Sequence, residues 1–188
     1  MGLKAVWIDL LYKSATGTKK VRTILTPIGA IIFGLFTIFF IIMAIKIDNL
    51  LNLPKIIISS SNLFISIPLV FLGIILTGWS VLHFMKVKGT PVPLNPPPKL
   101  VNSGPYSYTR NPMLTGIFLL MFGIGFWIGS FSLILVFTPL FILVNSLELK
   151  IIEEPEIERR LGKEYIEYKK KTPMFIPGLN FVLKRKRK

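Results

Sequence analysis

Four apolar runs constrain the fold of this chain more than any other feature of its sequence. They cover residues 28–45, 63–85, 113–128 and 131–147, and each approaches or reaches the roughly 17 to 25 residues that a membrane-spanning helix requires. A helix is stable in a bilayer because all of its backbone hydrogen bonds are internal. Only Gly129 and Ser130 separate the last two runs, which predicts a tight helical hairpin. The sequence therefore predicts an all-α integral membrane protein with about four transmembrane helices.

Composition narrows the class of protein further. The 188 residues are 52% hydrophobic and 17% charged, which is typical of one integral membrane unit rather than a water-soluble domain. The chain has no cysteine, which excludes disulfides, thiolate metal sites and a cysteine nucleophile. The single histidine, His83, cannot form a metal site alone. We therefore expect no metal in the functional site.

The distribution of basic residues predicts the orientation in the membrane. Of the 23 lysines and arginines, 5 precede the first apolar run, 4 lie between the second and third runs, and 12 follow the fourth. Only 2 lie between the first and second runs, and none lies at the hairpin tip. Cytoplasmic flanks of membrane spans collect Lys and Arg. Both termini and the loop at 86–112 are therefore expected on the cytoplasmic side.

The remaining segments are assigned by the same reasoning. Residues 1–26 are expected at the membrane surface, residues 27–147 hold the spans, and residues 148–188 form a short cytoplasmic helical tail. A helix in the first segment would gather large apolar side chains on one face, namely Leu3, Trp7, Leu10 and Leu11. The net charge of +14 does not predict a nucleic-acid partner, because the membrane flanks and the basic stretch at 184–188 account for it. That stretch is expected to bind anionic membrane lipid.

The loop before the third run has a stiff, polar sequence. Its prolines preset an extended backbone at little further entropic cost, as the wall of a pocket requires, and they are Pro91, Pro93, Pro96, Pro97 and Pro98. Asn111 precedes Pro112, and a proline in the first turn predicts that the third helix begins there. The free N–H groups of that helix end would face the loop and could bind a carboxylate.

Two stretches of this sequence resemble a known family. The first stretch, residues 88–116, contains Gly104, Tyr106, Arg110, Asn111, Pro112 and Gly116. The second stretch, residues 153–177, contains Glu153, Glu154, Ile157, Gly162, Tyr165, Tyr168, Pro173, Phe175 and Pro177. In this order, with a predicted hairpin between them, they resemble the isoprenylcysteine carboxyl methyltransferase family in its broad prokaryotic branch, in a variant that reads RNPM. That family is related to the phospholipid N-methyltransferases.

The resemblance implies a single membrane methyltransferase domain over residues 1–188 that uses S-adenosylmethionine. Its acceptor would be a lipid or another lipophilic molecule from the membrane. The residues that would contact the cofactor are Tyr106, Asn111, Pro112, Met113, Leu114 and Glu153. Arg110 and Glu153 would be the catalytic residues.

The chain departs from the family pattern at several positions, one of which bears on the substrate. Asn111 stands where the best-known members have histidine, and Leu161 replaces a phenylalanine. Leu149 occupies the position at which the eukaryotic enzymes carry an arginine that faces the prenylated substrate. The resemblance therefore does not extend to a prenylcysteine carboxylate as the acceptor.

Several of these residues have a second interpretation from the sequence. Glu153 could cap a helix, and Tyr106 could belong to an interfacial aromatic belt. Arg110 could pair with a glutamate of the tail or extend to the lipid headgroups. His83 could be an interfacial residue or a cofactor ligand. Glu154 is expected to begin a helix, so that Glu154→Gln would have a mild effect.

Three other functions compete with carboxyl methyl transfer. The first is N-methylation of a phospholipid by the same cofactor. The second is reduction of a membrane substrate by NADPH, because sterol reductases resemble this methyltransferase fold in their carboxyl-terminal half. The third, and the least favoured, is a non-enzymatic membrane scaffold.

Overall fold

The computed structural model describes residues 2–56, 61–87, 89–90 and 92–177. The basic stretch at 184–188 lies outside the described residues. Within them every regular element is helical: α1 (Leu3–Thr16), α2 (Lys19–Leu50), α3 (Ser61–Lys86), η1 (Gly104–Ser107), α4 (Pro112–Ile128), η2 (Leu133–Phe137), α5 (Thr138–Glu148), η3 (Leu149–Glu153), α6 (Glu154–Leu161) and α7 (Lys163–Lys171). The all-α architecture predicted from the sequence is confirmed.

Three of the helices are long and apolar enough to cross a membrane. They are α2, α3 and the helix from Leu133 to Leu161, with α4 as a shorter apolar helix. The third is built from η2, α5, η3 and α6 without interruption, because Phe137, Glu148 and Glu153 at their junctions all have right-handed helical backbone angles. Glu154 therefore continues a helix, and the expectation that it begins one is wrong.

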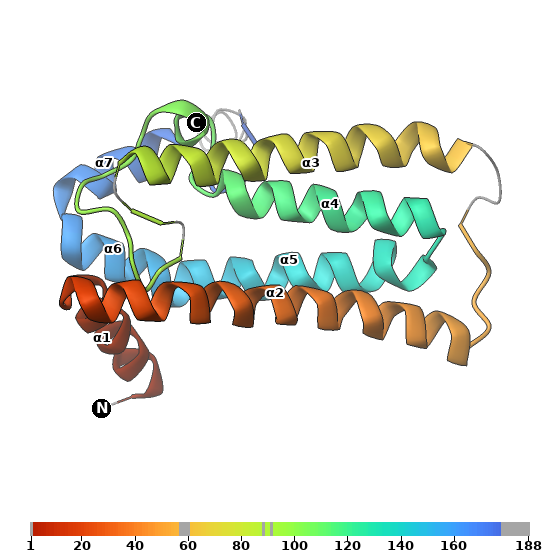
Figure 1. Cartoon of the computed structure of the whole chain (residues 1–188), viewed down its shortest axis with the longest axis horizontal. Helices are drawn as coiled ribbons and strands as arrows, with labels where there is room; N and C mark the ends of the chain where they lie inside the picture. Colours follow the sequence, from red (N-terminus) through yellow and green to blue (C-terminus); the bar gives the residue numbers. More distant parts are fainter. Residues whose placement is uncertain (1, 57–60, 88, 91, 178–188) are drawn as a thin grey trace, which may run out of the picture.

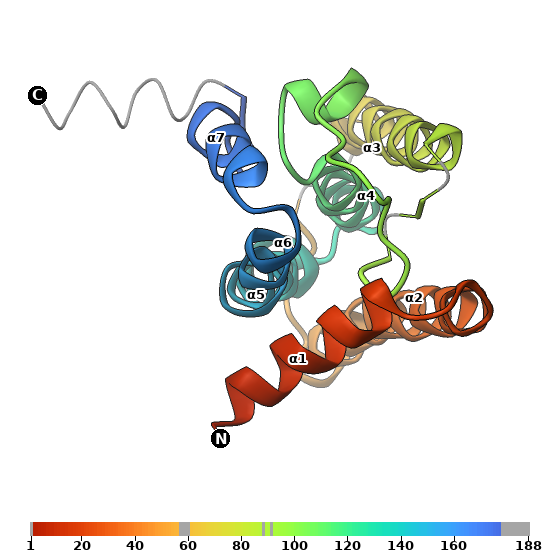
Figure 2. The ribbon, with the colours of Figure 1, turned by 90° about the vertical axis from the view of Figure 1, so that its left-hand side faces the viewer.

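The long helices run lengthwise along the molecule, and α1, α6 and α7 lie at one end of it (Figure 1). α3 and α4 lie side by side. Viewed along the helices, α2, the α3–α4 pair and the α5–α6 helix surround a common centre (Figure 2). The elements expected on the cytoplasmic side thus gather at one end.

α3 and α4 pack so closely that only small residues fit between them. A Cβ atom at Gly73 would lie 2.7 Å from both the carbonyl oxygen of Gly116 and the Cγ atom of Leu120. Farther along the same interface, the Ser66 hydroxyl donates a hydrogen bond of 2.9 Å to the carbonyl of Gly123. Small residues and hydroxyl groups are the usual means of joining helices in a bilayer, where lipid is as apolar as the side chains.

α2 is joined to the other helices at two levels. Phe36 and Phe40 place their rings 5.5 Å and 5.2 Å from that of Phe141, which is fully buried. At the end of α2, the Asp48 carboxylate accepts a hydrogen bond from the hydroxyl of Ser130 and one of 2.9 Å from the backbone N–H of Ser132. The Asp48 contacts lie in the last turn of α2, at the end of the helix away from α1.

The hairpin predicted between the last two apolar runs is a sharp turn. Gly129 ends α4 with φ of 67°, a left-handed conformation that glycine adopts without strain. The N–H of Ser130 then closes the turn by donating a hydrogen bond of 2.9 Å to the carbonyl of Gly125.

We expect Gly73→Leu to destabilise the protein by about 1 to 3 kcal/mol, because the larger side chain must push α3 away from α4. Thermal unfolding of the purified protein in detergent measures this effect. Gly78→Leu is the matched control on the same helix, since a Cβ atom there meets nothing within 4 Å. Equal stability of the two variants would contradict the close α3–α4 contact.

Candidate functional site

A cavity of about 890 Å³ lies at the end of the bundle that carries α1 and α7, both of which contribute to its lining. Its apolar wall comes from α2, α3 and the proline-rich loop, and it includes Phe33, Phe36, Phe84, Val92, Leu94 and Pro96. Its polar wall comes from the two motif stretches and from the end of α5, and it includes Tyr106, Arg110, Asn111, Glu148, Glu153 and Glu156. The same cavity therefore has a polar wall and an apolar wall.

Gly104 sets the path of the first motif. Its φ of 58° is left-handed, and a Cβ atom there would lie 2.8 Å from the ring of His83. The Nε2 atom of His83 is hydrogen-bonded to the Ser103 hydroxyl at 3.0 Å, and His83 is not among the residues that line the cavity. The position of His83 supports a packing role rather than contact with a ligand.

Tyr106 follows this turn and faces the cavity. It is 5% exposed, and its ring lies edge-on to that of Phe84 at 4.6 Å. Burial raises the pKa of its phenol above the ordinary value, so the hydroxyl stays protonated at neutral pH. A place in an exposed aromatic belt does not fit Tyr106, whereas Tyr108 is 61% exposed.

The backbone of the second motif holds the first in place. The carbonyl of Met174 accepts hydrogen bonds from the Thr109 hydroxyl at 2.7 Å, the Asn111 N–H at 3.2 Å and the Asn111 side-chain amide at 3.3 Å. The N–H of Arg110 donates to the carbonyl of Pro173 at 2.9 Å. Segments far apart in sequence thus meet at the start of α4.

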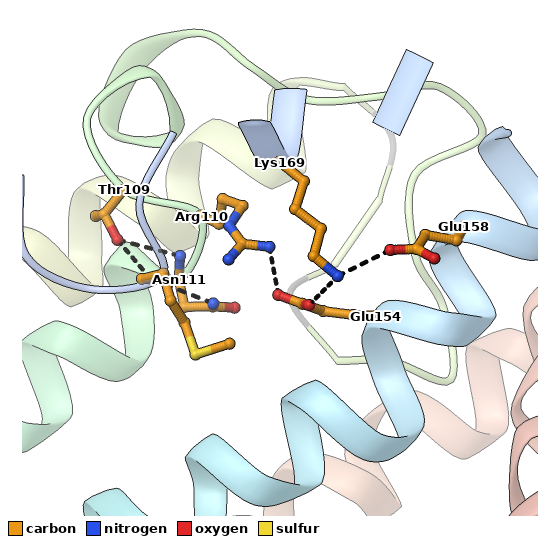
Figure 3. Close-up of polar contacts among 7 residues, drawn as sticks. Thr109, Arg110, Asn111, Glu154, Glu158 and Lys169 are labelled. Carbon is orange, nitrogen blue, oxygen red and sulfur yellow. Dashed lines mark hydrogen bonds and ion pairs between the residues drawn. The ribbon is translucent and has the colours of Figure 1, made fainter. Parts of the chain in front are cut away.

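Arg110 crosses from the first motif to α6, where it forms an ion pair with Glu154 (Figure 3). The side chains are 10% and 4% exposed. Lys169 of α7 joins them, with its ammonium group 2.5 Å from Glu154 and 2.8 Å from Glu158 (Figure 3). Of the two interpretations of Arg110, the pairing with a tail glutamate is the one that the structure shows.

Burial and neighbouring charges shift the pKa values of Lys169 and Tyr165 on α7. Burial opposes the charge of Lys169, but its hydrogen bonds with Glu154 and Glu158 outweigh burial and raise the pKa of the ammonium group. Burial, followed by the Glu154 carboxylate, raises the pKa of the Tyr165 phenol to about 12. The Tyr168 hydroxyl donates a hydrogen bond of 2.5 Å to the carbonyl of Tyr106. At neutral pH, Lys169 is therefore charged and Tyr165 is neutral.

The structure brings most of the predicted site residues to one cavity. The six that line it are Tyr106, Arg110, Asn111, Met113, Leu114 and Glu153. Pro112 does not line it: this residue is buried and begins α4, as the Asn-Pro sequence predicts. Whether these residues bind a ligand stays a prediction.

Sequence reasoning missed two contributions to the cavity. α2 supplies part of the apolar wall, although the first apolar run adds nothing to the motif resemblance. Glu148 lines the cavity with Glu153, although residues five apart point about 140° away from each other on an ordinary α-helix. The sequence does show a glutamate five residues before Glu153, but placing both side chains on one face requires knowing that the helix is π-helical there.

The polar wall offers groups of both charge signs. The backbone N–H groups at the start of α4 suit a carboxylate, whereas the carboxylate of Glu153 suits an ammonium or sulfonium group. The residues present therefore fit a ligand such as S-adenosylmethionine, which carries a carboxylate, an ammonium and a sulfonium group.

Comparison with models of protein families gives a match to one described as phospholipid methyltransferase, over residues 61–164. No curated protein and no solved structure matches the chain. The matched segment holds the α3–α4 pair and the carboxylates of the polar wall. It leaves out α2 and the backbone around Met174.

We expect Glu154→Gln to destabilise the protein by about 3 to 5 kcal/mol, because it leaves the charge of buried Arg110 without its partner. This replaces the mild effect expected from the sequence. Glu158→Gln removes the other partner of Lys169. Because Glu158 is more exposed than Glu154, this change should lower stability by less than about 1 kcal/mol. Thermal unfolding of the two variants in detergent decides between these roles, and two equally small losses would contradict the structural importance of the Arg110–Glu154 pair.

Proposed function

The chain belongs to the phospholipid methyltransferase family, and from this premise we propose that it transfers a methyl group from S-adenosylmethionine to a lipid-like acceptor. The observation that carries the proposal is the single cavity, which joins the polar wall of the two motifs to the apolar wall of α2. A water-soluble donor and a membrane-soluble acceptor can meet only in a chamber with both kinds of surface.

The polar wall would hold the cofactor. Arg110 and the N–H groups at the start of α4 would bind its carboxylate, and Glu153 would neutralise positive charge. Tyr106, Met113 and Leu114 would contact its less polar parts. When bound, S-adenosylmethionine supplies a methyl group on a positively charged sulfur. The residues of the chain then have to align the acceptor with that group and exclude water.

The acceptor would enter from the membrane between α2 and α3. Both helices line the cavity, but α2 makes its main contacts with η2 and α1 rather than with α3. The basic flanks favour the cytoplasmic side for this end of a four-span bundle. Donor and acceptor would therefore arrive from different directions.

The acidic wall favours an amine over a carboxylate as the acceptor group. Glu148 and Glu153 would repel a prenylcysteine carboxylate, and Leu149 offers it no positive partner. N-methylation of a phospholipid amine is thus the second candidate beside methyl transfer of the isoprenylcysteine carboxyl type. NADPH-dependent reduction has less support, because the family match is to methyltransferases.

The proposal predicts that the purified protein binds S-adenosylmethionine but not NADPH in isothermal titration. Asn111→Ala should weaken binding of S-adenosylmethionine by about 1 to 2 kcal/mol if a buried hydrogen bond is lost. Thr109→Val is the matched control, since Thr109 bonds the same carbonyl of Met174 but does not line the cavity. Equal losses in both variants would show that Asn111 acts only through its hydrogen bonds to the Met174 carbonyl, and would remove it from the cofactor site.

Glu153→Gln keeps the shape of the side chain but removes its charge. If Glu153 neutralises the cofactor, affinity for S-adenosylmethionine should fall by about 2 kcal/mol or more. Titration calorimetry measures the change, and Glu167→Gln on the exposed surface of α7 should leave affinity unaltered. An unchanged affinity in Glu153→Gln would exclude this glutamate as a cofactor contact.

A further inference from the structure

We propose that Glu148, which the π-helical turn η3 stacks beside Glu153 in the cavity, binds the ammonium group of the acceptor and takes up its proton. The inference rests on the proposed function and deepens it, because it assigns the acceptor side of the site. Glu153 then serves the donor side and Glu148 the acceptor side.

The backbone of η3 is what brings the two carboxylates together. On an α-helix, residues five apart lie about 140° from each other around the axis. In a π-helix the hydrogen bonds join residues five apart, so such residues stack along one face. η3 is π-helical over Leu149–Glu153, and Glu148 and Glu153 both line the cavity. Without this turn, Glu148 would point away from the cavity.

Glu148 lies where the polar wall meets the apolar one. Val144 and Asn145, about one turn earlier on the same helix, also line the cavity, and Phe141 below them packs against Phe36 of α2. The α2 residues in the lining carry no charge. An acceptor whose tail lies along α2 would therefore meet Glu148 before it meets Glu153.

The arginines that line the cavity are paired with other glutamates. Arg110 is paired with Glu154, and Arg160 with Glu156 at 2.8 Å. Among the described residues, no salt bridge reaches Glu148 or Glu153. The titratable or charged groups that line the same cavity are Lys99, Tyr106, Arg110, Glu148, Glu153, Glu154, Glu156, Arg160, Tyr165 and Tyr168.

Burying carboxylate charge without a partner is costly. A buried acidic pair is therefore stabilised by a shared proton in the free protein and by a bound cation when the acceptor is present. A primary or secondary ammonium group would satisfy Glu148, because it brings both a positive charge and N–H donors.

The transfer of a proton from the acceptor to Glu148 requires no other reactant. An amine has no free electron pair while it is an ammonium ion. At Glu148, one N–H bond of the ammonium breaks, one O–H bond forms on the carboxylate, and the electron pair remains on nitrogen. The neutral amine then has the lone pair that methyl transfer requires. A quaternary ammonium group has no such proton and cannot take this step.

The test compares wild type, Glu148→Gln, Glu148→Asp and the surface control Glu167→Gln in vesicles of phosphatidylethanolamine with labelled S-adenosylmethionine. Glu148→Gln should lower the rate of methylation roughly 100-fold at neutral pH, as for loss of a general base. Its remaining rate should rise about tenfold per pH unit, because solvent must then deprotonate the ammonium, whereas the wild-type rate should level off. Glu148→Asp should restore part of the rate, and Glu167→Gln should match wild type.

Two further measurements separate this role from a structural or cofactor role. Glu148→Gln should bind S-adenosylmethionine as wild type does, unlike Glu153→Gln. Infrared spectra without acceptor should show the carbonyl stretch of a protonated carboxylic acid in wild type and a weaker one in Glu148→Gln, because the variant keeps only one of the two adjacent carboxyl groups that bind protons.

Three outcomes would overturn the assignment. An unchanged rate and pH profile in Glu148→Gln would remove Glu148 from the acceptor side. A loss of cofactor affinity equal to that of Glu153→Gln would make it part of the cofactor site. Wild-type protein that neither binds S-adenosylmethionine nor methylates any lipid would overturn the proposed function itself, which the first two outcomes leave intact.

Discussion

The ion pair between Arg110 and Glu154 is the interaction on which the rest of the site depends. A guanidinium group with little exposure to solvent requires a counter-charge, and Glu154 on α6 is the only carboxylate that bonds it among the described residues. The pair fixes the loop before α4 against the helix that follows η3. Both polar surfaces of the cavity are therefore held at a set distance by one buried contact, which Lys169 reinforces from α7.

Two different packing regimes build the chamber around this contact. α3 and α4 are in close backbone contact through glycine and hydroxyl groups, which gives a rigid partition. α2 is held by a phenylalanine cluster, whose Phe33 and Phe36 also line the cavity, and by the Asp48 carboxylate near the end of the helix. α2 has few contacts with α3, which leaves room for the cavity between them.

The sequence predicts those parts of the structure that depend on local chemistry. Hydropathy locates the apolar helices, because each must satisfy its backbone within itself. The Asn-Pro pair marks the start of α4, and the motif residues identify most of the polar wall. What it cannot predict depends on distant or cooperative geometry: the partner of Arg110, the three hydrogen bonds to the Met174 carbonyl, and the π-helical turn that aligns Glu148 with Glu153. A pattern of residue types does not show which carbonyl each backbone N–H group bonds. For this reason the Glu-Pro sequence at Glu154 predicts a helix start, although the helix is continuous there.

The family match covers one wall of the cavity and leaves out the wall that α2 forms. The matched family segment begins at residue 61, after α2 has ended at Leu50. The charged lining and the α3–α4 partition therefore belong to a module that is distinct from the helix forming the facing apolar wall. A chimaera that exchanged only α2 would reshape the lipid-facing chamber while every ionised group of the cavity lining stayed in place.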